Sequence, residues 1–184
     1  SRTGISQDDK LDDLEIVAAC TSVSRWIDEY CDRQFYRVSD TRTFAADCGT
    51  EVDVGDLISV TTLKTGTGDG TFTTTWSESE YQLMPFAPRP GWPYTSIRAT
   101  GQRFPVAFGV GRVDRIQIDG VFGWPAVPAP VRQAAAIMVN DLFKLGTMAF
   151  GVAGYGEYGP MRARANPVAT ELLAPYRRTP VLVG

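Results

Sequence analysis

The stretch FGWPAVPAPVRQAAAIMV (residues 122–139) decides how this chain folds. Its three prolines, Pro125, Pro128 and Pro130, exclude regular secondary structure over residues 125–129. The ring of Pro130 holds the backbone angle of a first helical position, where no N–H is needed, so a helix begins there. The stretch therefore predicts a sharp boundary between a strand-rich middle and a helical C-terminal part.

Composition limits both the number of domains and the kind of function. The chain has 184 residues, of which 43% are hydrophobic, and this favours one domain with one core. Its formal net charge of -3 argues against tight binding to DNA phosphates. Histidine is absent, which removes the commonest general base and the commonest metal ligand and argues against most hydrolases. Apolar runs are too short to span a membrane, and no basic-then-apolar leader is present, although a segment can be missing before Ser1.

The three cysteines, Cys20, Cys31 and Cys48, predict neither a zinc site nor a disulfide framework. They are odd in number and lack CxxC spacing. If Cys20 and Cys31 share a helix, they lie about 16 Å apart, beyond the reach of a disulfide. We expect reduced, packed thiols in a reducing compartment.

The N-terminal region predicts an amphipathic helix from near Gln7 to about Arg33. Ser6 and Asp9 have the spacing of a capping box, and further aspartates fill the first turns, as suits a helix N-terminus better than a cation site. Apolar residues recur at steps of three and four, which is typical of a helical stripe. The stripe consists of Leu14, Val17, Ala18, Thr21, Val23, Trp26, Ile27 and Tyr30.

The middle of the chain is rich in threonine, valine and aromatic residues and predicts strands. They are expected at residues 57–65, 72–76, 81–84, 96–100 and 112–122. The glycines of GTGDG (residues 66–70) favour a hairpin connection over half of a calcium loop. Residues 85–93, which include Arg89 and Trp92, contain too many prolines for a central strand and predict an exposed, stiff loop.

The C-terminal part predicts two helices, a connector and a tail. The first helix follows Pro130, with Gly146 at its C-cap. A flexible glycine-rich connector (residues 151–159) carries Tyr155 and Tyr158, and no strand precedes it, which argues against nucleotide binding. A short last helix starts at Asn166 and Pro167 and ends or kinks at Pro175. The remaining residues, 176–183, are too short to fold alone.

We expect no catalytic residues, no metal site and no cofactor. The three lysines lie far from any serine motif, so nucleophilic catalysis is disfavoured. A two-carboxylate glycosidase or a carbohydrate-binding module remains an alternative, because aromatic side chains can stack on sugars, but no pair of carboxylates stands out. The candidate stacking residues are Trp76, Tyr81, Trp92 and Tyr94.

Four segments together resemble the head-to-tail connector (adaptor) proteins of long-tailed double-stranded DNA bacteriophages. They are IDEYCDRQF (27–35), FGWPAVP (122–128), FGVAGYGEYG (150–159) and LLAPYRR (172–178). The resemblance spans nearly the whole chain. It implies a single connector domain of α+β class, residues 1–184, with a helical bundle core from the N-terminal and C-terminal helices and a β-rich insertion. The parts are the N-terminal helix (1–36), the insertion (37–125), the next helix and connector (126–165), and the short helix and docking tail (166–184).

The resemblance also implies a function in the virus particle. Such adaptors are structural proteins of the neck, not enzymes, and are assembled in the host cytoplasm. They form a ring, typically dodecameric, under the portal protein, and extend the channel through which double-stranded DNA is ejected, without binding it specifically. They also present a platform for a downstream stopper or tail terminator protein, and no membrane is involved. Another neck, tail-completion or decoration protein is the alternative within the virion.

Two sets of residues are candidate contacts in such an assembly. The tail is partly basic and partly apolar, so we expect it to become ordered only when it meets the portal. Truncation after Pro175 should then abolish attachment and leave the fold intact. The candidate portal-binding residues are Tyr176, Arg177, Arg178, Val181 and Leu182. The candidate ring or tail contacts are Arg89, Trp92, Tyr155 and Tyr158.

Overall fold

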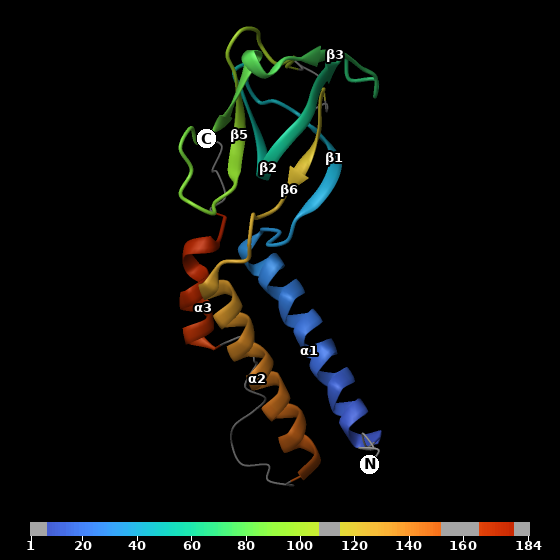
Figure 1. Cartoon of the computed structure of the whole chain (residues 1–184), viewed down its shortest axis with the longest axis vertical. Helices are drawn as coiled ribbons and strands as arrows, with labels where there is room; N and C mark the ends of the chain where they lie inside the picture. The colour runs from blue at the N-terminus through green and yellow to red at the C-terminus, as the bar shows by residue number, and fades with distance from the viewer. Residues whose placement is uncertain (1–6, 107–114, 152–165, 179–184) are drawn as a thin grey trace, which may run out of the picture. The chain divides into compact units, whose positions relative to one another are not determined.

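A computed structural model describes residues 7–106, 115–151 and 166–178 (Figure 1). It contains helices and an antiparallel sheet, so the predicted α+β class is confirmed. The contacts that residues make in space divide the chain into two compact units. We call residues 1–33 with 128–184 the helical unit and residues 34–127 the sheet unit.

The described residues of the helical unit form three α-helices, with α2 packed between α1 and α3 (Figure 1). They are α1 (Gln7–Cys31), α2 (Ala129–Gly151) and α3 (Pro167–Leu173), and a short 3-10 helix, η3 (Ala174–Tyr176), follows. Each helix buries residues spaced by three or four positions, as the helical period requires. These residues are Val23, Ile27 and Cys31 on α1, Val131, Ala134 and Met138 on α2, and Ala169 and Leu173 on α3.

The predicted apolar stripe of α1 is buried only in its C-terminal half. Val23 and Ile27 are 3% and 2% exposed, whereas Leu14 and Val17 are 67% and 63% exposed. At 100° per residue, Leu14 lies on the side of the helix opposite Val23, so one neighbouring helix cannot cover both. The part of the prediction that placed Leu14 and Val17 in one stripe with Val23 and Ile27 is therefore wrong.

The C-terminus of α1 closes in a Schellman motif. The Asp32 N–H donates to the Glu29 carbonyl at 3.3 Å, and the Arg33 N–H donates to the Asp28 carbonyl at 3.0 Å. Asp32 has a φ of 49°, the left-handed conformation that this motif needs and that glycine usually supplies. The helix thus ends close to the predicted position without the expected glycine signal.

The C-terminal end predicted for α2 was wrong. The helix continues through Gly146 to Gly151. A glycine inside a helix costs only about 1 kcal/mol, and the neighbouring leucine, methionine and alanine residues favour helix. By contrast, α3 begins as predicted, because Asn166 caps it by accepting from the N–H groups of Val168 and Ala169, and Pro167 occupies the first turn.

The described residues of the sheet unit form a six-stranded antiparallel sheet. Its strands are β1 (Val38–Phe44), β2 (Glu51–Gly66), β3 (Phe72–Trp76), β4 (Tyr81–Met84), β5 (Tyr94–Ala99) and β6 (Ile116–Phe122), with a 3-10 turn η1 (Glu78–Glu80) before β4. The order is β1-β6-β2-β5-β4, and β3 pairs with β2 (Figure 1). Every second residue of β6 is buried, from Ile116 to Phe122, which gives the sheet a packed face. The core also includes Leu57, Leu63, Trp76, Ile97 and Phe104.

The predicted strands are largely confirmed, with two differences at the start of the sheet. Residues 112–114 of the last predicted strand lie outside the described residues, and β6 begins at Ile116. No strand was predicted at β1, and β2 begins six residues before the predicted residue 57. Gly55 has a φ of 75°, and the pairing of β2 with β5 shifts register between Asp53 and Leu57. A bulge therefore carries the strand through residues that otherwise favour a turn. The glycine turn is confirmed: Gly68 and Gly70 have positive φ between β2 and β3.

The proline junction behaves as predicted. β6 ends at Phe122, residues 123–128 are irregular, and α2 starts at Ala129. Gly123 has a φ of 99°, and a Cβ there would collide with the carbonyl oxygen of Tyr36. Only glycine fits this close approach. The next side chain, Trp124, is 1% exposed and is held within the sheet unit.

Candidate interaction surfaces

The described residues show no cluster of metal-ligating side chains. No group of three or more cysteine, aspartate or glutamate residues in this part of the chain is arranged to hold a metal ion. Among the helices as described, none is both long and apolar enough to cross a membrane. Three segments of the described surface stand out as candidate contacts: the C-terminal segment, the proline-rich loop and the N-terminal half of α1.

Residues 176–178 are anchored to the end of α1, and we call them the C-terminal clamp. The Arg33 Nε donates to the carbonyl of Tyr176 at 2.7 Å, and the Arg178 N–H donates to the carbonyl of Cys31 at 2.9 Å. The latter satisfies one of the carbonyls that a helix end leaves without an intrahelical partner. The Arg177 guanidinium lies 4.8 Å from the centre of the Tyr30 ring, a cation-π distance.

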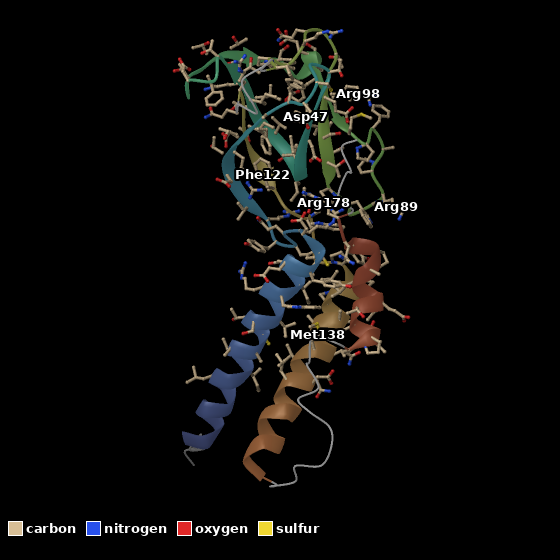
Figure 2. The ribbon with its side chains drawn as sticks, turned by 180° about the vertical axis from the view of Figure 1, so that it is seen from behind. Asp47, Arg89, Arg98, Phe122, Met138 and Arg178 are labelled. Atoms are coloured by element: carbon tan, nitrogen blue, oxygen red, sulfur yellow. The ribbon has the colours of Figure 1, made fainter. Side chains whose placement is uncertain are left out.

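The clamp corrects the expectation for the tail. Tyr176, Arg177 and Arg178 already have partners in their own chain, so these three do not wait for a partner before they are ordered. Figure 2 labels Arg178 just beyond α3. Val181 and Leu182, the other two candidate portal-binding residues, lie outside the described residues.

The start of α3 is also fixed. The Asn166 side chain, which caps the helix, donates from Nδ2 to Asp141 Oδ2 on α2 at 2.7 Å. Together with the clamp, this contact ties the last helix to α2 at one end and to α1 at the other. Residues 166–178 are therefore held to the helical unit at both ends.

Burial shapes the chemistry of the thiol beside the clamp. Cys31 is 0% exposed, and this burial raises the pKa of its thiol to about 11, although the positive charges of Arg33 and Arg177 act in the opposite direction. The prediction of packed thiols is confirmed for Cys31 and wrong for Cys20 and Cys48, which are exposed. The Thr50 hydroxyl, 3.3 Å from the Cys48 sulfur, is the main cause that lowers the pKa of that thiol.

The proline-rich loop (residues 85–93) is exposed in part. Phe86 is 74% exposed, and Arg89 is also exposed at the margin of the loop (Figure 2). Trp92, in contrast, is half-buried, with its ring centre 4.9 Å from that of Trp124. The loop thus uses Trp92 to hold itself to the sheet unit and leaves Phe86 and Arg89 for contacts.

Phe86 was missed as a candidate contact because a single phenylalanine between prolines carries no periodic signal. The sequence gives no basis for choosing between burial and exposure at such a position. The other two candidate ring or tail contacts, Tyr155 and Tyr158, lie outside the described residues.

A buried polar pair supports the junction and was not anticipated. The Trp124 indole Nε1 donates to Asp56 Oδ2 at 3.1 Å, and the backbone carbonyl of Asp56 accepts from the Gly123 N–H at 2.9 Å. The ring of Phe35 also packs against Trp124, with the two ring centres 5.3 Å apart. Asp56 is 6% exposed, so these bonds compensate for the burial of its polar atoms.

The aromatic residues considered as sugar platforms serve the core of the sheet unit. Trp76 is 5% exposed, donates to Thr65 Oγ1 at 3.0 Å and stacks on Phe104. Tyr81 and Tyr94 pack against the buried cluster. A sugar ring needs an open aromatic face, and the buried Trp76 does not offer one.

Comparison with solved structures shows the same fold in the necks of phage-like particles. The first match, "Neck of empty GTA particle computed with C6 symmetry", has a TM-score of 0.59 at 18% identity and covers 100% of this chain and 87% of the other. The second, "Neck of native GTA particle computed with C12 symmetry", has a TM-score of 0.54 at 19% identity and covers 92% and 85%. GTA stands for gene transfer agent. No protein-family profile and no curated protein matches the sequence.

Proposed function

We propose that this chain is a structural protein of the neck of a phage-like particle, where it acts as the head-to-tail adaptor. The observation that carries the proposal is the similarity of fold over the entire chain to a protein in the neck of the gene transfer agent. A second line agrees with it: the order of the four sequence segments resembles that of the phage adaptor family.

In this proposal the chain forms a ring, a dodecamer, under the portal protein. The symmetries of the two similar structures, six-fold and twelve-fold, support a ring. A ring subunit needs two different faces that complement each other, and the rotation between neighbours must close. The helical bundle then acts as the core of the connector, and the sheet unit is the insertion whose loop residues Phe86 and Arg89 meet the ring neighbour or a downstream tail protein.

The ring lengthens the DNA channel without holding the DNA. The net charge of -3 limits electrostatic binding of phosphates, and weak binding lets DNA slide during ejection. The portal is the second partner, reached by the tail that follows the clamp. The clamp residues set where this tail begins, and Val181 and Leu182 supply its apolar contacts with the portal.

Assembly with the portal tests the proposal directly. The purified chain is mixed with portal rings and analysed by native mass spectrometry and electron microscopy, and particles made without the chain are examined for tails. We expect a ring of about twelve copies stacked on the portal, and full heads without tails when the chain is missing. A monomer that leaves the portal unoccupied, together with normally tailed particles, would show that the chain has another role.

The role of the tail in portal binding is tested by a truncation that keeps the clamp. Removal of everything after Pro175 would also delete the contacts to Arg33 and Cys31, so the cut belongs after Arg178. We expect the chain ending at Arg178 to melt like the full chain and to lose portal attachment. A full chain with Val181→Ser and Leu182→Ser serves as the matched control for length, and it should lose attachment as well. Attachment of both variants to the portal would show that the tail does not form part of the portal interface.

A further inference from the structure

The N-terminal half of α1 exposes apolar side chains that point in several directions. The segment LEIVAACT (residues 14–21), which we call the α1 apolar segment, holds one charged residue in eight. Leu14, Ile16 and Val17 are 67%, 40% and 63% exposed. They make up three of the seven large hydrophobic residues exposed in the described part of the chain. Ala18 and Cys20 are exposed as well.

The directions of these side chains require more than one covering surface. Val17 and Leu14 lie 60° apart on the helix, whereas Ile16 points about 160° away from Leu14, toward the side of Val23 and Ile27. A helix that is apolar all round belongs in the interior of an assembly, because water on every side would leave this surface uncovered. Contacts from at least two directions are therefore needed to bury the segment.

We propose that the α1 apolar segment is buried by neighbouring copies of this chain. The inference rests on the proposed ring, in which each copy meets one neighbour on either side. Charge favours a second copy in a head-to-tail arrangement. The helix Gln7–Cys31 has seven acidic and two basic residues, whereas residues 128–184 have six basic and three acidic ones.

The same charges disfavour a symmetric pair in which two α1 helices meet. Such a pair would bring two strongly acidic helices together, whereas a head-to-tail contact lets the acidic helix of one copy approach the basic part of the next. An arrangement of this second kind is the one that closes into a ring. The apolar surface and the charge distribution thus agree on the same occupant.

The reactivity of the native cysteines measures directly whether the α1 apolar segment is buried in the ring. Cys20 lies in the α1 apolar segment, and the exposed Cys48 in the sheet unit serves as an internal reference. The full chain is labelled with a maleimide before and after assembly on portal rings, and the sites are quantified by mass spectrometry. We expect the labelling rate of Cys20 to fall at least tenfold in the ring relative to that of Cys48.

Substitution supplies the second measurement. Leu14→Asp with Val17→Asp should leave the far-ultraviolet circular dichroism unchanged, since both side chains are exposed, and should yield monomers in place of rings. Val168→Asp is the matched control, because Val168 is an apolar helical residue that is 54% exposed outside the segment, and this variant should assemble.

The outcomes separate this inference from the proposed function. Rings with Cys20 still reactive, or rings of the double variant, would overturn the inference and leave the adaptor role in place. Protection of Cys20 by portal rings at copy numbers too low for contact between copies would identify the portal as the occupant and overturn it too. Protection in the monomer would identify a segment of the same chain. Absence of any ring from the native chain would overturn both proposals.

Discussion

The buried thiol of Cys31 makes the stability of this protein depend on pH in a calculable way. Burial raises its pKa from 9.0 to about 11 in the folded chain. Above pH 9 the unfolded chain loses this proton, while the folded chain keeps it until pH 11, so the unfolded state binds fewer protons and stability falls as the pH rises. The loss amounts to about 2 kcal/mol by pH 11 and is negligible at pH 8.

Urea denaturation at pH 8, 9, 10 and 11 measures this effect. Because tyrosines and lysines also titrate in this range, the informative quantity is the difference between the native chain and Cys31→Ala, which lacks the thiol. We expect the native chain to lose about 2 kcal/mol more than the variant between pH 8 and pH 11. A thiol reagent at pH 8 should also modify Cys20 and Cys48 rapidly and Cys31 only after unfolding. Equal pH dependence of the two proteins, or rapid modification of all three thiols, would refute the assigned burial.

Three further substitutions test the local structure, each by urea denaturation at pH 7. Trp124→Phe should cost about 1–3 kcal/mol, because it removes the indole donor to the buried Asp56 carboxylate; a cost under about 0.5 kcal/mol would contradict that bond. Asp32→Gly should stabilise the chain by up to about 1 kcal/mol, since glycine adopts a φ of 49° without strain, and a loss of stability would speak against the Schellman motif. Gly123→Ala should cost more than about 2 kcal/mol, because the new Cβ meets the Tyr36 carbonyl at positive φ; a neutral effect would argue against the junction as described.

Local signals predicted much of the fold because they act over a few residues. The prolines at 125, 128 and 130 fix the boundary between sheet and helix, and Asn166 with Pro167 fixes the start of α3. Gly68 and Gly70 fix the hairpin between β2 and β3. In each case the chemistry of one or two residues decides the local backbone, so tertiary contacts are not needed to make the choice.

The structure differs from the sequence-based prediction where tertiary contacts decide which conformation a segment adopts. β1 has the sequence VSDTRTF, whose polar residues give little sign of a strand, and it forms because β6 offers a pairing edge along its entire length. Leu14 and Val17 are neighbours on the surface of α1, but Leu14 lies opposite Val23, and steps of three and four residues added along the helix hide this change of side. The number of partners around a helix depends on the assembled protein, and a single chain does not encode it in a local pattern.

For the candidate contact residues too, the sequence predicted local properties and not tertiary contacts. Composition and position singled out Arg89, Arg177 and Arg178 as candidate contacts, which stay predictions. They gave no sign that Arg178 binds the end of α1 through its backbone N–H, because any residue type can donate such a bond. This bond and the Arg33 contact to Tyr176 hold the base of the tail at one place on the helical unit. If the ring forms as proposed, every copy starts its tail at an equivalent point, so the tails meet the portal as a regularly spaced set. Attachment then gains from many weak contacts made at once, and a loosened clamp, as in Arg33→Ala, should reduce portal affinity far more in the ring than in a single subunit.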